Sequence, residues 1–322
     1  MKSRKAQWIA FWIALLVLGL LLIIWSLQGV PFAEIGQVLS TLGFWQIAAL
    51  LMVNIGILFL FPLRWWLIVR AQGYRVPYLA LTQYRLVVFA ISYFTPGQHF
   101  GGEPFQVLYL RNRHKMPGST ALASVTLDKV IELFANFAVL ALGLAVLVFT
   151  GVVVELPLAQ TLPISLVLLL VPSIYLVSVR FGARPLRFLA KRLSGGLAEG
   201  IRNAEEQLGS LAKEKPGLLG QGLLIAIAVW VALIFEIWLL LFFLSLPVDA
   251  LELTLVIVAA RVALFAPTPG ALGALEASQV LAMQALGYSP AYGIGLALLI
   301  RARDVLFGLV GLSLAGIEQG QQ

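Results

Sequence analysis

The 322-residue sequence contains no cysteine, only two histidines, and charged residues amounting to just 11% of the chain. Without cysteine there is no disulfide, no thiolate metal site and no cysteine nucleophile. Two histidines disfavour a zinc centre or a Ser-His-Asp hydrolase. The patterns G-x-x-x-x-G-K-[ST], H-E-x-x-H and G-x-S-x-G are also missing. We therefore expect no metal, no cofactor and no ATP hydrolysis through a phosphate loop.

Hydrophobic residues, in contrast, make up 61% of the chain, well above the ~45–50% of soluble domains. Six apolar segments reach the roughly 20 residues that a helix needs to cross a bilayer. These segments are residues 7–27, 44–69, 119–149, 161–180, 218–246 and 290–313. The first is longer than a signal-peptide core and lacks a small-x-small cleavage site, so we expect a retained anchor. The sequence predicts an all-α polytopic membrane protein.

Two further apolar stretches, residues 78–112 and 250–286, are interrupted near their middle by proline and glycine. Proline cannot continue a helix and glycine permits a turn, so each stretch predicts two half-length helices meeting inside the membrane. Broken backbone is tolerated there only where protein or a watery cavity covers it. We predict two re-entrant hairpins whose breaks contain Pro96, Gly97, Gly101, Gly102, Pro269, Gly270 and Gly273.

The interrupted stretches are copies of each other. At a constant offset of 173, residues 95–134 and 268–307 are identical at ten of forty positions. One long offset in a hydrophobic chain indicates a duplicated half rather than a solenoid. We expect a single transmembrane domain over residues 1–322, with repeat 1 at about 44–149, repeat 2 at about 218–313, and the spans 7–27 and 161–180 as additions.

Lysine and arginine are distributed unevenly along the chain. They cluster at the N-terminus, near Arg70, and within residues 111–115 and 180–215, whereas the loops 28–43, 150–160 and 247–250 have none. The positive-inside rule places both termini in the cytoplasm, together with the linker 181–215. That linker contains either an amphipathic surface helix that attracts anionic lipid or simply an ordinary basic connection.

This topology makes the two hairpins enter the membrane from opposite sides, as an inverted repeat in a multi-pass protein of the cell membrane. The net charge of +7 is explained by the basic residues of the cytoplasmic segments. We therefore expect no nucleic acid partner.

Charged residues also lie within the apolar segments, where each costs roughly 2.5–3.5 kcal/mol and needs a partner or a function. Asp128 and Glu132 form an acidic cluster, and under the repeat Asp128 aligns with Arg301 in a basic cluster. We expect the two clusters either to neutralise each other across the repeat interface or to hold a substrate. The candidate substrate-binding residues are Glu103, Asp128, Lys129, Glu132, Glu276, Arg301, Arg303 and Asp304.

The other polar residues at this depth leave alternatives open. Glu103 and Glu276 can bind backbone amides of the opposite broken helix, relay protons, or contact a cationic headgroup. Arg64 and Glu236 can form an ion pair or snorkel. His99 and Arg261 lie beside the breaks and can line a cavity.

With these motifs the chain resembles the transmembrane, flippase-type region of lysylphosphatidylglycerol synthases and its stand-alone, YbhN-like relatives. The matching motifs are Pro96 to Gly101-Gly102-Glu103-Pro104, Asp128-Lys129 with Glu132, Pro269-Gly270 to Gly273 to Glu276, and Arg301. Lys129 stands where arginine is commoner, and Ala271 where a second glycine is usual. Lysine at position 129 cannot bind a phosphate through two parallel hydrogen bonds as arginine does.

The resemblance implies lipid translocation between leaflets. In the two-domain synthases, aminoacyl transfer belongs to a soluble C-terminal domain, which we do not expect here, so we expect no enzymatic activity. We predict a flippase for a phospholipid or related anionic lipid. The alternatives are a lipid-modifying enzyme using Asp128 and Glu132, a lipid-binding accessory subunit, or a transporter of small solutes. Membrane lipids are the expected partners; the oligomeric state stays open, a homodimer included.

Overall fold

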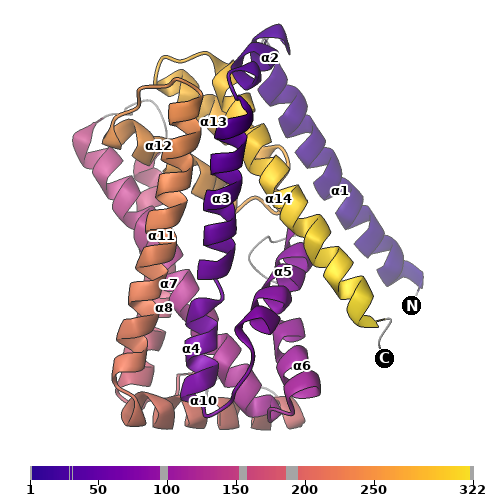
Figure 1. Cartoon of the computed structure of the whole chain (residues 1–322), viewed down its shortest axis with the longest axis vertical. Coiled ribbons are helices and arrows are strands. Elements are labelled where there is room, and N and C mark those ends of the chain that lie inside the picture. Colours follow the sequence, from indigo (N-terminus) through magenta and orange to yellow (C-terminus); the bar gives the residue numbers. More distant parts are fainter. Residues whose placement is uncertain are drawn as a thin grey trace.

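The computed structural model describes residues 2–28, 30, 32–94, 101–151, 158–185 and 195–319, a region that is helical and contains no strand. Figure 1 shows the helices as an elongated bundle. In chain order they are α1 (Lys2–Leu27), α2 (Phe32–Ser40), α3 (Phe44–Leu60), α4 (Leu63–Ala71), α5 (Tyr78–Phe94), α6 (Glu103–His114), α7 (Gly118–Thr150), α8 (Leu158–Arg180), α10 (Gly196–Glu214), α11 (Gly217–Phe243), α12 (Ala250–Ala263), the 3-10 turn η1 (Pro269–Ala271), α13 (Ala274–Ala285) and α14 (Pro290–Gln319).

Four helical stretches in the described part of the chain are long and apolar enough to cross a membrane. They are Phe44–Ala71, which joins α3 and α4, then Gly118–Thr150, Thr161–Arg180 and Gly217–Phe243. The predicted span 290–313 lies in α14, which has 30 residues but carries three charged side chains near its middle. The predicted span 7–27 lies in α1. The predicted all-α polytopic membrane fold is confirmed.

Both interrupted stretches form pairs of shorter helices. The first pair is α5 and α6, and the second is α12 and α13 with η1 between them. In Figure 1, α6 lies at the end of the bundle that α10 crosses, whereas α12 and α13 lie at the other end. The two hairpins therefore lie toward opposite ends of the bundle. Pro96 and Gly97 lie outside the described residues, as does His99.

Two glycines show how closely each break is packed against a neighbouring helix. Gly273 has φ +78°, and a Cβ there would lie 2.2 Å from the carbonyl oxygen of Gly19 in α1. A Cβ at Gly102 would lie 2.7 Å from the carbonyl oxygen of Val88 in α5. The additional helix α1 thus covers the second break with protein, as broken backbone at membrane depth requires.

The two halves pack against each other reciprocally. Helix α14 packs against α5, α7 packs against α12, and α3 packs against α11. A Cβ at Gly311 of α14 would lie 2.3 Å from the carbonyl oxygen of Leu86, and one at Gly143 of α7 would lie 2.6 Å from Val258 Cγ2. Small residues allow membrane helices such close approach. The last helix of each half therefore contacts the first hairpin helix of the other half.

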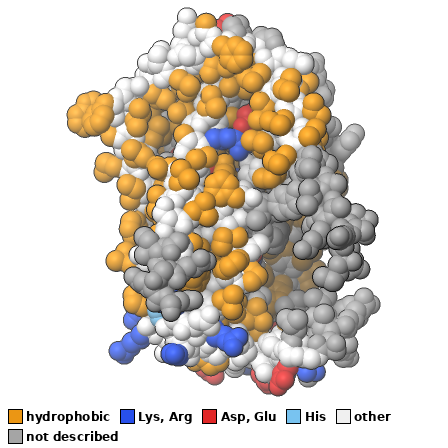
Figure 2. Space-filling view, turned by 90° about the vertical axis from the view of Figure 1, so that its right-hand side faces the viewer, with side chains coloured by type: hydrophobic (Ala, Val, Ile, Leu, Met, Phe, Trp, Pro, Cys, Tyr) orange, Lys and Arg blue, Asp and Glu red, His pale blue; other side chains and the backbone are white. Residues whose placement is uncertain are grey.

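One end of the bundle is basic. Helix α10, inside the predicted linker 181–215, crosses this end (Figure 1), and its apolar residues Ala204, Leu208 and Leu211 are buried in a cluster shared with α7 and α8. Figure 2 shows lysine and arginine side chains gathered at this end. At the opposite end, the first turns of α2 and α12 contain Glu34 and Glu252, and Asp249 precedes α12. The described residues of 30–43 and 245–252 include no lysine or arginine. The beginning of α1 and the end of α14 point toward the basic end (Figure 1).

We expect Gly273→Ala to destabilise the protein, because the new methyl group meets α1 and the left-handed backbone costs about 1–3 kcal/mol for a residue with a side chain. Thermal unfolding of the purified protein in detergent measures the effect. Gly220→Ala on α11, where no atom lies within 4 Å of an added Cβ, is the matched control and should melt at or above the parent temperature. An unchanged melting temperature for Gly273→Ala would contradict the packing described.

Candidate functional site

A cavity of about 270 Å³ lies between the two hairpins, with walls contributed by both halves of the chain. Most of its lining is apolar, including Phe61, Phe89 and Leu233. The charged lining residues are Arg64, Arg85, Glu103, Lys129, Glu132, Glu236, Arg261, Arg303 and Asp304. Its volume lies just below the ~300–1,000 Å³ typical of small-molecule pockets.

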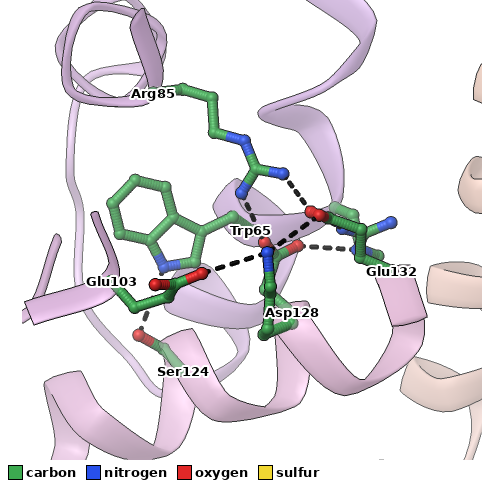
Figure 3. Close-up of polar contacts among 8 residues, drawn as sticks. Trp65, Arg85, Glu103, Ser124, Asp128 and Glu132 are labelled. Atoms are coloured by element: carbon green, nitrogen blue, oxygen red, sulfur yellow. Dashed lines mark hydrogen bonds and ion pairs between the residues drawn. The ribbon is translucent and has the colours of Figure 1, made fainter. Parts of the chain in front are cut away.

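In the first half, Arg64 and Arg85 converge on the acidic face of α7, and Figure 3 shows Arg85 directed at Asp128 and Glu132. Asp128, only 2% exposed, accepts from Arg64 Nε at 2.6 Å and from Arg85 Nη1 at 2.9 Å. Arg85 also donates to Glu132. Asp128 and Glu132 are four residues apart and share one face of the helix, so a single guanidinium reaches both. The buried carboxylates of α7 are thereby neutralised by α4 and α5.

The first break is tied to α7 through a separate ion pair. Lys129 Nζ lies 3.0 Å from Glu103 Oε1 and 3.1 Å from Glu132 Oε1. Glu103 Oε2 accepts a hydrogen bond from the backbone N–H of Gly101 at 2.9 Å. Glu103 therefore satisfies an amide of the break with one oxygen and binds the next span with the other.

The second break is held in the same way, by Arg301. Its Nη2 donates to Glu276 Oε2 at 2.9 Å, and that carboxylate accepts from the Gly273 N–H at 2.9 Å. Arg301 also donates to the carbonyl oxygens of Gly270 at 2.8 Å and Ala271 at 3.0 Å. The guanidinium thus satisfies backbone carbonyls that the interruption leaves without helical partners.

A second arginine of α14 joins that helix to α11. Arg303 Nη1 lies 2.6 Å from Glu236 Oε1, and Nη2 lies 2.8 Å from Asp304 Oδ1. Glu236 is 2% exposed. The guanidinium of Arg303 therefore binds two carboxylates.

Both halves use the same plan of ion pairs. The glutamate of each returning helix binds a basic residue of the following span, and the pairs are Glu103 with Lys129 and Glu276 with Arg301. A charged residue of the preceding span binds an opposite charge on that same following span. These pairs are Arg64 with Asp128 and Glu236 with Arg303, with their signs exchanged between halves.

The expected neutralisation of the two clusters across the repeat interface is wrong. Among the described residues, each ion pair inside the bundle joins two residues of the same half. Arg64 and Arg85 supply the positive charge that the acidic cluster needs. A hydrogen bond with an uncharged partner does link the halves: Arg301 donates to the Tyr93 hydroxyl at 3.2 Å. Glu103 and Glu276 each accept a hydrogen bond from an amide of their own break, Gly101 and Gly273.

The cavity separates the predicted site residues into two groups. Glu103, Lys129, Glu132, Arg303 and Asp304 line the cavity. Asp128, Glu276 and Arg301 do not, and their side chains are engaged in the ion pairs behind its wall.

Arg85 is missing from the candidate residues of the sequence analysis, although a lone arginine within the apolar segment 78–94 is itself a signal, because a charge at membrane depth needs a partner or a function. Arg64 and Glu236 do not pair with each other; Arg64 pairs with Asp128 and Glu236 with Arg303. Arg261 lines the cavity. The described residues offer no group of three His, Asp or Glu side chains able to hold a metal.

The side of the bundle drawn in Figure 2 is largely hydrophobic, as a surface in contact with acyl chains should be. A few basic and acidic side chains are visible among the hydrophobic ones in its upper half. Charged side chains are therefore exposed within this hydrophobic face.

Comparisons with known proteins agree with this architecture. A family model described as the lysylphosphatidylglycerol synthase TM region matches residues 11–311. The chain belongs to this family. A UPF0104 membrane protein of Methanothermobacter thermautotrophicus is 27% identical over 254 residues, which cover 73% of each chain. No solved structure matches the chain. Membership confirms the resemblance and connects this multi-pass membrane protein with a role in membrane lipids.

Because the ion pairs lie within each half, Arg301→Gln and Glu276→Gln should each destabilise the protein by about 3–5 kcal/mol, since each leaves a buried charge unpaired. The double variant should lose less than the sum, with a coupling of about 0.5–3 kcal/mol. SDS titration in mixed micelles gives the free energies. The control combines Arg301→Gln with Asp128→Asn, one change per half, and the two effects should add within ~0.5 kcal/mol. Strong coupling between these two changes would contradict the assignment of the ion pairs to separate halves.

Proposed function

We propose that the protein moves a phospholipid or related anionic lipid between the leaflets of the cell membrane. The observation that carries this proposal is the charged cavity between two opposed interrupted hairpins inside a hydrophobic bundle. Charges are expensive at this depth, and ion pairs serving stability alone need not surround an open space. Membership in a family connected with membrane lipids supports a lipid as the passenger.

The cavity offers cations that can exchange partners. Lys129 and Arg303 line it, and both are bound to carboxylates that line it too. An arriving phosphate accepts charge-assisted hydrogen bonds as a carboxylate does, so it can replace one carboxylate without leaving the cation unpaired. The headgroup would occupy the cavity while the acyl chains stay against the hydrophobic side of the bundle.

Neutral halves suit a transport cycle. Each hairpin is fastened to the following span of its own half by Glu103–Lys129 or Glu276–Arg301. A half can then tilt together with its hairpin without breaking ion pairs to the other half. Inverted-repeat transporters alternate access by such rocking around a site near the midplane. We place both termini and α10 in the cytoplasm, because the basic end should face inward.

A lipid-modifying enzyme built on Asp128 and Glu132 has less support. Both oxygens of Asp128 are bound by arginines, and Glu132 is bound by Arg85 and Lys129. Neither carboxylate is free to act as a base, so we propose transport without covalent chemistry.

Transport can be tested by reconstitution. Liposomes containing the protein and a trace of NBD-labelled phosphatidylglycerol report flipping as loss of protection from dithionite. We expect the parent to accelerate flipping, and Lys129→Gln and Arg303→Lys to slow it at least ~tenfold, a change of about 1.4 kcal/mol in the barrier.

Arg184→Gln is the control for the flipping assay, because Arg184 pairs with Glu206 on the exposed surface. Its flipping rate should equal that of the parent. A parent protein that flips no lipid from a panel of anionic, zwitterionic and glycosylated headgroups would refute the transport proposal, as would cavity variants as fast as the parent.

A further inference from the structure

Arg261 differs from the other cations that line the cavity. Arg64, Arg85, Lys129 and Arg303 each form an ion pair with a carboxylate. Arg261 forms none with any described residue. Its guanidinium carbon instead lies 4.5 Å from the ring centroid of Trp230 in α11. The residue sits near the end of α12, just before the second break, with its side chain on the cavity wall.

The first half contains a counterpart with the same surroundings. Arg85 lies on α5, the first helix of the first hairpin, and its guanidinium carbon is 5.8 Å from the ring centroid of Phe61 in the preceding span. With the offset of 173, Arg85 falls three residues before Arg261 and Phe61 four residues after Trp230, about one helical turn in each case. Both arginines therefore lie over an aromatic ring of the span that precedes their hairpin.

The two arginines differ in what the protein supplies to them. Arg85 has carboxylates of α7 beside its guanidinium. Glu236 and Asp304, the second-half carboxylates that line the cavity with Arg261, are both bound to Arg303. Arg261 has no such ion pair with a described residue, and its side chain lines the cavity. An external anion can bind Arg261 without displacing any ion pair, and so without the cost of unpairing a buried charge.

We propose that Arg261, held against Trp230, is the residue that receives the anionic group of the ligand, a phosphate or phosphodiester. A guanidinium presents its donors in a planar fork that matches two phosphate oxygens. Stacking on tryptophan uses the face of that fork and leaves its edge free. The assignment rests on the proposed function for the lipid as the source of the phosphate, and free phosphate is the other source.

The test is a binding measurement that does not require transport. The full-length protein in neutral detergent is titrated with short-chain phosphatidylglycerol, and stabilisation against thermal unfolding gives the Kd. We expect Arg261→Gln to raise the Kd at least ~tenfold, and Arg261→Lys, which keeps the charge but not the fork, to raise it less. Trp230→Phe should retain more affinity than Trp230→Leu, because only an aromatic ring supports the guanidinium.

Two further ligands identify the source of the anion. Short-chain diacylglycerol, which has the same tails without phosphate, should bind weakly and with no dependence on Arg261. Inorganic phosphate that binds as tightly as the lipid, and through Arg261, would support the anion site while assigning it to a free anion.

Arg202→Gln, an exposed change on α10, is the control and should bind like the parent. The assignment fails if Arg261→Gln melts like the parent without ligand and binds phosphatidylglycerol equally well, or if diacylglycerol binds as tightly as the phospholipid. A parent that binds the lipid through Arg261 but does not flip it would contradict transport alone. Unchanged flipping by Arg261→Gln would contradict the anion site alone.

Discussion

A helix interrupted inside a membrane must find partners for the backbone groups that the interruption exposes, and the rest of this structure depends on how that requirement is met. Glu276 accepts from the amide of Gly273, while Arg301 binds Glu276 and donates to carbonyls on the other side of the break. One ion pair thus satisfies both polarities of broken backbone. Because Arg301 belongs to the following span, the hairpin and that span form one unit, and a break is possible only where such a span is adjacent.

Duplication of this unit gives two halves that are each electrically complete. Among the described residues around the cavity and the breaks, the first half contributes Arg64, Arg85 and Lys129 against Glu103, Asp128 and Glu132, and the second contributes Arg261, Arg301 and Arg303 against Glu236, Glu276 and Asp304. With three charges of each sign, neither half needs the other for neutrality. The halves are joined by close helix packing, such as Gly311 of α14 against α5, and by the hydrogen bond from Arg301 to Tyr93. Contacts of this kind slide at less cost than buried ion pairs break, which favours relative movement of the halves.

The sequence was sufficient for every feature encoded locally. Proline and glycine predicted the interruptions, and apolar length located the four helical stretches long and apolar enough to cross a membrane. The constant offset indicated the duplication, and lysine and arginine marked one end of the bundle. Ion-pair partners are not encoded locally, since Asp128 and its partner Arg64 lie in separate spans. Alignment of Asp128 with Arg301 suggested pairing across the interface only because Arg85 was left out of the count. Once Arg111 and Glu252 near the segment ends are set aside, counting the remaining charges in the apolar segments gives neutral halves, although not the choice of partner within each half.

That choice of partner is where the two halves diverge, and it bears on how a ligand acts. In the first half Arg85 fastens α5 to α7, so the first helix of the hairpin is tied to the following span. The corresponding link from α12 to α14 is missing among the described residues, because Arg303 holds both nearby carboxylates and Arg261 holds none. A phosphate at Arg261 that also reaches Arg303 would supply the missing link. A ligand that links α12 to α14 in this way binds one arrangement of the second hairpin more tightly than another. This difference in affinity allows ligand binding to drive a conformational change.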